Sequence, residues 1–237
     1  MNGIYKKEPI VSAPGVVVAV IAIVSIIHLI RVLGGSFLDH ELINYLALYP
    51  YRIGPNSGDV SGGFFVGMTS LITHALLHSD WIHLFSNNAW LLAFGSLIAR
   101  RTSRLGFFLL FIICTICGGL TYLAINGFVK SIVIGMSGAV SGLMGASFRF
   151  IFLELENNSI KNLQYNPRSI LRLSLINALQ HRKTMMATGI WIAMNFLLAV
   201  LGPRMFGDGG IAWEAHLGGF LAGFLFFGTV DRGHSQY

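Results

Sequence analysis

Apolar residues along the chain gather in long runs that are separated by polar connections. A helix that crosses a bilayer needs about 20 mostly apolar residues. Six runs approach this length, and the fourth, which is short and rich in glycine, has the weakest hydropathy. They cover residues 15–33, 81–99, 105–125, 137–153, 184–202 and 211–230. The pattern predicts an all-α membrane protein, a bundle of six transmembrane helices.

A seventh stretch, Gly62 to His78, is only half apolar, and its polar residues make it a poor span. Charge supports leaving it out, because cytoplasmic loops of membrane proteins carry an excess of Lys and Arg. With six spans and both termini in the cytoplasm, most of the 16 basic residues lie on the inner side. The inner ones are Lys6, Lys7, Arg100, Arg101, Arg104, Arg149, Lys161, Arg168, Arg172, Arg182, Lys183 and Arg232, and the outer ones are Arg31, Arg52, Lys130 and Arg204.

The spans leave no stretch for a separate soluble domain, so we expect one membrane domain over residues 1–237. Its connections include a short cytoplasmic N-terminus (1–14), a long outer loop (34–80) and a basic cytoplasmic loop (154–183). In the cytoplasmic loop we expect an amphipathic helix, either on the membrane surface or packed against the bundle. Its apolar face would consist of Leu171, Leu175, Ala178 and Leu179.

Composition agrees with residence in a lipid bilayer. Hydrophobic residues make up 54% of the chain and charged residues only 11%, and the mean hydropathy is +0.68. A soluble domain of this size would need a more charged surface. The formal net charge of +6 belongs to the loops, so nucleic acid is not an expected partner. Cys114 and Cys117 lie within an apolar run and are expected to be small packing residues.

Four polar side chains in the spans need an explanation, because such groups are costly inside a membrane. His83 and Asn87 lie one turn apart near the start of the second span, Ser137 begins the fourth, and His216 lies early in the sixth. These three spans all run from outside to inside. The four groups therefore lie at a similar depth near the outer face, where they could form one site.

Small residues follow both Ser137 and His216, and they let membrane helices approach each other closely. The glycines are Gly138 and Gly142 in the first case and Gly219 and Gly223 in the second. Close approach would bring Ser137 Oγ within reach of His216, and a serine hydroxyl needs such a base to become a nucleophile. Taken singly, each feature also fits a structural role: a serine bonded to its own backbone, a buried hydrogen-bonding histidine, and glycines that only pack.

Three segments resemble the rhomboid family of intramembrane serine proteases, in the family's order and within its six-helix layout. They are Thr73-His74-Ala75-Leu76-Leu77-His78-Ser79-Asp80-Trp81-Ile82-His83-Leu84-Phe85-Ser86-Asn87, Gly135-Met136-Ser137-Gly138, and Ala215-His216-Leu217-Gly218-Gly219 with Gly223 beyond. The resemblance covers nearly the whole chain. The combination is specific, although Gly-Xaa-Ser-Gly alone is not.

The resemblance implies an endopeptidase with a Ser-His dyad, in which Ser137 is the nucleophile and His216 the general base. The Ser137 backbone N–H and the side chains of His83 and Asn87 would hold the oxyanion, and no cofactor or metal is expected. The implied substrates are transmembrane segments of other membrane proteins, cut near the outer face. From the compact length, we expect a bacterial inner membrane protein whose site opens to the outer side.

The sequence departs from well-known rhomboids in two places. A Trp-Arg pair of the outer loop is replaced by Thr69 and Ser70. An aromatic residue four positions after the nucleophile, which can stack on the catalytic histidine, is replaced by Ser141. His74 and His78 match family positions, and we expect them to shape the outer loop rather than to take part in chemistry.

Three other functions stay open. An inactive rhomboid-like protein would bind membrane proteins without cutting them, although the presence of both Ser137 and His216 argues against this. A metal site could use His74 and His78, which lie four residues apart, but no further cluster of ligands completes a shell. The third is a channel or secondary transporter, although the inverted repeat that often marks transporters is not evident.

Overall fold

Residues 34–80, the predicted outer loop, fold into helices in the computed structural model, which describes residues 13–55, 57–157, 160–206 and 210–235. The first span is α1 (Gly15–Leu33), and α2 (Gly35–Leu46) follows it after a glycine. Two short 3-10 turns, η1 (Pro50–Arg52) and η2 (Ser57–Asp59), lead into α3 (Gly63–Thr73) and η3 (His74–Leu76). Helix α3 has only 11 residues, and it covers most of the half-apolar stretch from Gly62 to His78 that was not counted among the predicted spans.

The second span is one continuous helical segment with three parts. It consists of α4 (Trp81–Trp90), a π-helical stretch η4 (Leu91–Gly95) and α5 (Ser96–Arg101). The segment begins at Trp81 because Asp80 is its N-cap: Asp80 Oδ1 accepts a hydrogen bond of 2.9 Å from the His83 backbone N–H. Hydrogen bonds from the Ser79 hydroxyl and the His83 backbone lower the pKa of Asp80, so this cap stays a carboxylate.

The third span, α6 (Arg104–Asn126), has clear signals at both ends. Ser103 Oγ caps its first turn by accepting from Gly106 N–H at 3.0 Å. Gly127, with a φ of +70°, ends it in a conformation that glycine adopts without strain. A loop then leads to α7 (Ser137–Phe148), which begins at the predicted nucleophile.

In the predicted cytoplasmic loop, the described residues form short helices: α8 (Ile151–Glu156), α9 (Ile160–Tyr165), η5 (Pro167–Ser169) and α10 (Leu175–Gln180). The amphipathic helix expected from Leu171 to Leu179 is therefore only partly present. Ser174 starts α10 by capping it, with its Oγ accepting from Asn177 N–H at 3.1 Å. Before this cap, the Arg172 backbone N–H donates to the His234 carbonyl, and the chain is bridged to Ser235 instead of being helical.

The last two α-helices are α11 (Arg182–Phe206) and α12 (Trp213–Phe226), and a 3-10 turn, η6 (Phe227–Thr229), ends the bundle. Among the described residues, four helical segments are long and apolar enough to cross a membrane: Gly15–Leu33, Trp81–Arg101, Arg104–Asn126 and Arg182–Leu201. With 12 and 14 residues, α7 and α12 are shorter than these four.

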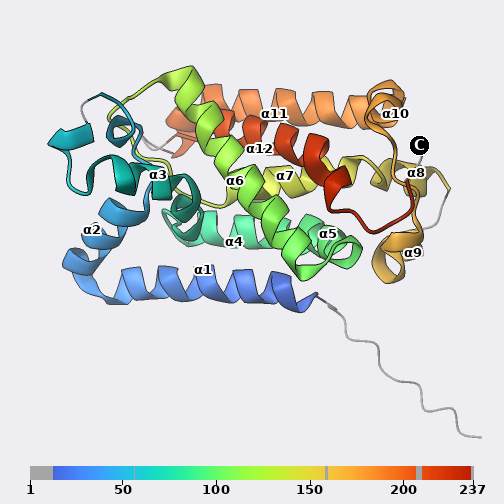
Figure 1. The fold of residues 1–237 in the computed structure, drawn as a ribbon, viewed down its shortest axis with the longest axis horizontal. Coiled ribbons are helices and arrows are strands. Elements are labelled where there is room, and N and C mark those ends of the chain that lie inside the picture. Colours follow the sequence, from blue (N-terminus) through green and yellow to red (C-terminus); the bar gives the residue numbers. More distant parts are fainter. Residues whose placement is uncertain (1–12, 56, 158–159, 207–209, 236–237) are drawn as a thin grey trace, which may run out of the picture.

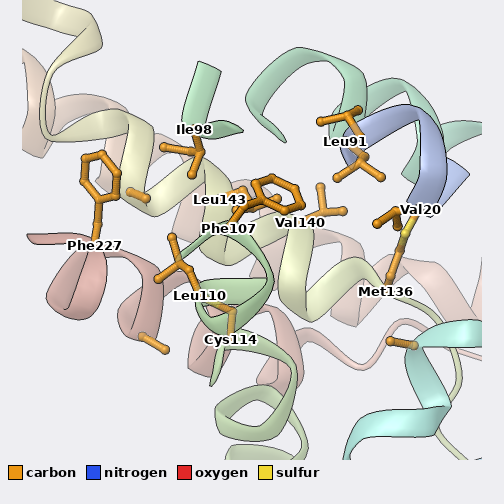
Figure 2. Close-up of a cluster of buried hydrophobic side chains, with 14 of the residues drawn as sticks. Val20, Leu91, Ile98, Phe107, Leu110, Cys114, Met136, Val140, Leu143 and Phe227 are labelled. Carbon is orange, nitrogen blue, oxygen red and sulfur yellow. The ribbon is translucent and has the colours of Figure 1, made fainter. Parts of the chain in front are cut away.

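Helix α7 is the centre of the bundle. Every residue from Gly138 to Phe148 is buried, and its main neighbours are α12, α6 and η4. Figure 1 shows α1, α4, α7, α12 and α11 lying along the length of the molecule, while α6 crosses them at an angle. Figure 2 shows the central core, to which η4 contributes Leu91, α6 contributes Phe107 and α7 contributes Leu143. A helix surrounded in this way contacts protein on all sides.

Candidate active site

The chain that leads to Ser137 is fixed by the outer loop. Val133 pairs with Leu48 through two backbone hydrogen bonds, of 2.8 and 3.0 Å. The Gly135 N–H then donates to the His74 carbonyl at 2.9 Å. Because α7 begins at Ser137, the Ser137 backbone N–H precedes the first hydrogen bond within the helix. The outer loop therefore sets the place where the serine enters the bundle.

The contact between α7 and α12 has no space for side chains. A Cβ atom added to Gly219 would lie 2.0 Å from the Gly138 carbonyl oxygen, and one added to Gly223 would lie 1.8 Å from that of Gly142. A Cβ added to Gly142 would lie 2.2 Å from Cys114 Sγ of α6 and 2.7 Å from the Gly219 carbonyl oxygen of α12. The four predicted packing glycines therefore lie where two helix backbones touch. The buried Cys114 fills the adjacent notch as a free thiol.

This close contact brings the serine and the histidine together. His216 Nε2 and Ser137 Oγ are 2.8 Å apart, which is hydrogen-bond distance, although 79 residues separate them in the sequence. Both side chains are only half buried, in contrast to the fully buried glycines beside them. The arrangement is that of a hydroxyl and a base in contact, at the ends of α7 and α12 that lie near the outer loop.

A residue that the sequence analysis did not single out contacts the other side of the imidazole. Asn195 of α11 is buried, and its Oδ1 lies 2.9 Å from His216 Nδ1. Its Nδ2 donates to the Trp213 carbonyl at 3.1 Å. A signal was present in the sequence, because Asn195 is a lone amide in an apolar span, and polar groups in such spans need a partner.

His83, which was predicted to belong to the site, lies beside Ser137. A Cβ added to Gly135 would be 2.8 Å from His83 Nε2 and 3.9 Å from Ser137 Oγ, so both atoms border one small volume. His83 Nδ1 faces away from it, 3.0 Å from Ser79 Oγ. The imidazole thus presents Nε2 to the region around the serine.

Asn87 is buried one turn further along α4. Its Nδ2 donates to the His83 carbonyl at 2.9 Å, and so the hydrogen bond that the structure gives it lies within its own helix. The structure therefore joins Ser137 to His216 directly and places His83 next to them. The Asn87 amide donates to the backbone of the helix that carries His83, and not to Ser137.

His74 and His78 occupy two different environments in the outer loop. His74 Nδ1 lies 2.8 Å from the Ser70 carbonyl, while the His74 carbonyl accepts from Gly135. The His78 ring packs edge-on against that of His83 with centroids 5.1 Å apart, and its carbonyl accepts from Arg31 Nη1 at 2.6 Å. These contacts join the outer loop to the site. The sequence predicted that His74 and His78 shape this loop.

The first turn of α12 is held by a second neighbour as well. Glu214 is buried there, and its Oε1 accepts a hydrogen bond of 2.9 Å from Asn126 Nδ2 of α6. A carboxylate near a helix N-terminus is favourable because of the helix dipole. The turn that carries His216 is therefore bonded to α6 on one side and, through Asn195, to α11 on the other.

These features define a helical membrane protein in which two short, buried helices bring a serine and a histidine into contact. Comparison with known proteins agrees. The Rhomboid domain family matches residues 66–232. The Rhomboid protease GlpG of Haemophilus influenzae is 26% identical over 165 residues, which is 68% of either chain. The chain belongs to the rhomboid family, and it is an integral membrane protein.

Proposed function

We propose that this protein is an intramembrane serine endopeptidase that uses Ser137 and His216 as a catalytic dyad. The observation that carries the proposal is the 2.8 Å separation between Ser137 Oγ and His216 Nε2. A base within about 2.6–3.2 Å of the hydroxyl can take its proton. Membership of a family that contains proteases supports the same activity.

The proposed reaction has two stages. Ser137 Oγ attacks the scissile carbonyl while its proton moves to His216 Nε2, and the tetrahedral intermediate collapses when the histidine returns this proton to the leaving amine. A water molecule then attacks the acyl-enzyme while His216 takes its proton. The histidine returns this proton to Ser137 Oγ as the ester bond breaks, and the carboxylic acid product is released. His216 thus acts first as base and then as acid in each stage.

The developing oxyanion would be bound by three donors: the Ser137 backbone N–H in the first turn of α7, His83 Nε2, and the Asn87 amide. His83 is already beside the serine, whereas Asn87 would use the second N–H of its amide, because the first donates to the His83 carbonyl. A donor of this kind contributes about 2.7–4 kcal/mol in a comparable protease.

The proposed substrates are transmembrane segments of other membrane proteins. In this proposal, α7 and α12 complete a set of six spans with both termini in the cytoplasm. The short central helices begin near the outer loop, so the dyad would lie in the outer part of the membrane. A bacterial inner membrane, with the site open to the outer side, is the proposed location.

A serine-reactive fluorophosphonate probe tests the proposal on the full chain in detergent. We expect labelling of the wild type and none of Ser137→Ala or His216→Ala, because the first lacks the nucleophile and the second lacks the base. A reporter with a transmembrane segment should be cut by the wild type alone. A folded wild type that neither labels nor cuts would favour an inactive binding protein, and labelling of Ser137→Ala would assign the nucleophile to another residue.

Gly135 gives a separate prediction about the oxyanion donors. An alanine there would place its Cβ 2.8 Å from both Nε2 and Cε1 of His83, at a φ of +114° that side chains rarely adopt. We expect Gly135→Ala to displace His83 and lower kcat about 10²- to 10³-fold, the loss typical of one donor. Reporter cleavage gives the measurement.

Gly127→Ala is the matched control, since Gly127 lies in the same loop with a φ of +70° and has open space around it. If both variants lose activity equally, backbone strain and not His83 is responsible. Wild-type kcat in Gly135→Ala would contradict the proposed role of His83.

A further inference from the structure

We infer that Asn195 is a positioning residue for His216: its amide fixes which ring nitrogen carries the proton and holds the imidazole towards Ser137. The inference rests on the proposed dyad and extends it with a residue of α11. Its basis is a chain of hydrogen bonds from the Trp213 carbonyl through Asn195 and His216 to Ser137.

The Trp213 carbonyl determines how the amide is oriented. A carbonyl oxygen only accepts hydrogen bonds, so the Asn195 atom that faces it at 3.1 Å must be the NH₂ group. The amide oxygen then points in the other direction, where it lies 2.9 Å from His216 Nδ1. Asn195 is buried, and rotation of the amide by half a turn would place an oxygen against an oxygen.

The amide oxygen in turn determines the tautomer of His216. Oxygen accepts, so Nδ1 must carry the proton and donate it. In the neutral imidazole, Nε2 is then left with its lone pair, and this atom is 2.8 Å from Ser137 Oγ. This is the state that a general base needs, because Nε2 must accept the hydroxyl proton. The opposite tautomer would direct an N–H at the serine and could not activate it.

Asn195 is itself held in place by aromatic contacts between α11 and α12. Trp191 stacks on Phe220 with ring centroids 4.3 Å apart, one turn before Asn195. Phe196 packs edge-on against Trp213 at 5.9 Å. These pairs fix the register of the two helices, so the amide meets the imidazole even though most of the α11 surface is exposed.

Ser141 lies one turn after Ser137 in α7, and its side chain is short. A serine offers no ring to stack, so the imidazole needs another support. Asn195 supplies one by a hydrogen bond at Nδ1 instead of by contact with the ring face.

The first test is kinetic and follows fluorophosphonate labelling across pH. Asn195→Ala removes the acceptor, and we expect the maximal labelling rate to fall about 10²-fold, as expected for a misoriented group, with the half-saturating probe concentration nearly unchanged. Asn195→Asp keeps an acceptor and adds a negative charge that stabilises the imidazolium. We expect it to recover most of the rate and to shift the acidic limb of the pH profile to higher pH.

Asn126→Ala is the matched control. It also removes an amide that bonds the first turn of α12 to a neighbouring helix, but at Glu214 and not at the histidine. We expect its pH profile to match that of the wild type. The inference is overturned if Asn195→Ala labels like the wild type, or if Asn195→Ala and Asn195→Asp lose rate equally with an unmoved pH profile.

A second measurement separates this inference from the proposed function. Nitrogen-15 NMR of the histidine-labelled protein, with His216→Gln used to identify the resonances, reports which ring nitrogen is protonated. We expect Nδ1–H in the wild type and a mixture of tautomers in Asn195→Ala. If the wild type shows this Asn195-dependent tautomer but does not label, the proposed function fails and the inference stands. If the wild type and Asn195→Ala show the same tautomer, the inference is overturned, whatever the activity of either protein.

Discussion

Replacing Gly223 with alanine is expected to separate α7 from α12 and to abolish the contact between Ser137 and His216. The new Cβ would lie 1.8 Å from the Gly142 carbonyl oxygen, and this is a backbone atom that no rotamer change can move. Overpacking a close contact costs about 1–3 kcal/mol, occasionally more. We expect a loss of about 3 kcal/mol or more in the free energy of unfolding.

The same substitution should affect the dyad more strongly than its effect on stability suggests. A displacement of about 1 Å at a reacting centre can lower the rate about 10²-fold. Helices α7 and α12 touch at Gly219 as well as at Gly223, so a shift at Gly223 should extend to His216, two turns earlier. Thermal unfolding in detergent measures the first effect, and fluorophosphonate labelling at a temperature where the variant stays folded measures the second.

Gly189→Ala is the control for these measurements. Gly189 also lies within a helix, α11, but no atom lies within 4 Å of the position that its added Cβ would take. We expect unchanged labelling and equal or higher stability, because alanine favours the helix by about 1 kcal/mol over glycine. Wild-type stability and labelling in Gly223→Ala would contradict the close contact of α7 and α12.

Replacing Asp231 with asparagine should produce the second large effect, at the opposite end of the bundle. The Asp231 side chain is fully buried, and it accepts from Arg101 Nε and Nη2 at 2.9 and 2.8 Å and from Arg172 Nε at 2.9 Å. Arg101 is also completely buried and donates through Nη1 to the carbonyls of Pro167 and Ile170. One carboxylate thus ties the cytoplasmic loop and the C-terminal segment to the end of α5.

Asparagine keeps the shape of this side chain but removes its charge, which leaves buried guanidinium groups without an anion. Breaking a buried ion pair from one side costs about 3–5 kcal/mol. We expect a clear fall in the thermal unfolding temperature and faster proteolysis near Pro167. Labelling at low temperature should persist, because the site lies at the other end of the helices.

Glu156→Gln is the comparison for Asp231→Asn. Glu156 lies in the same loop and pairs with Lys183 at 3.2 Å and His181 at 3.5 Å, but the Lys183 side chain is exposed. Exposed pairs of this kind contribute little, so we expect no measurable change in the unfolding temperature. An equal response of the two variants would mean that the Asp231 cluster is not the anchor of the loop.

Much of the architecture follows from local sequence. The apolar runs predicted the long helices within a few residues: 15–33 corresponds to α1, 105–125 to α6, and 81–99 to the segment from Trp81 to Arg101. This works because a membrane helix satisfies its own backbone hydrogen bonds, and its length is set by the bilayer. The placement of Ser137 and His216 at the start of two helices with the same direction also came from the sequence.

Other features depend on residues that are distant in the chain. The amphipathic pattern at Leu171 to Leu179 predicted a longer helix than α10, because the pattern does not reveal that Arg172 is held by Asp231 and His234. The span at 137–153 is divided into α7 and α8 near Arg149. There the Arg149 Nη2 donates to the Leu173 carbonyl at 2.8 Å, a contact across the cytoplasmic loop.

The sequence by itself determined the long apolar helices and the polar groups that lie near their ends, since hydropathy, charge and glycine spacing act locally. Only the tertiary structure decided which groups touch. It placed Ser137 Oγ against His216 Nε2 and put Asn195 of α11 on the far side of the same ring. A hydrogen bond between two helices requires that the donor and the acceptor agree in position and direction. Ser137 and His216 meet this requirement because α7 and α12 pack with glycines against backbone carbonyls.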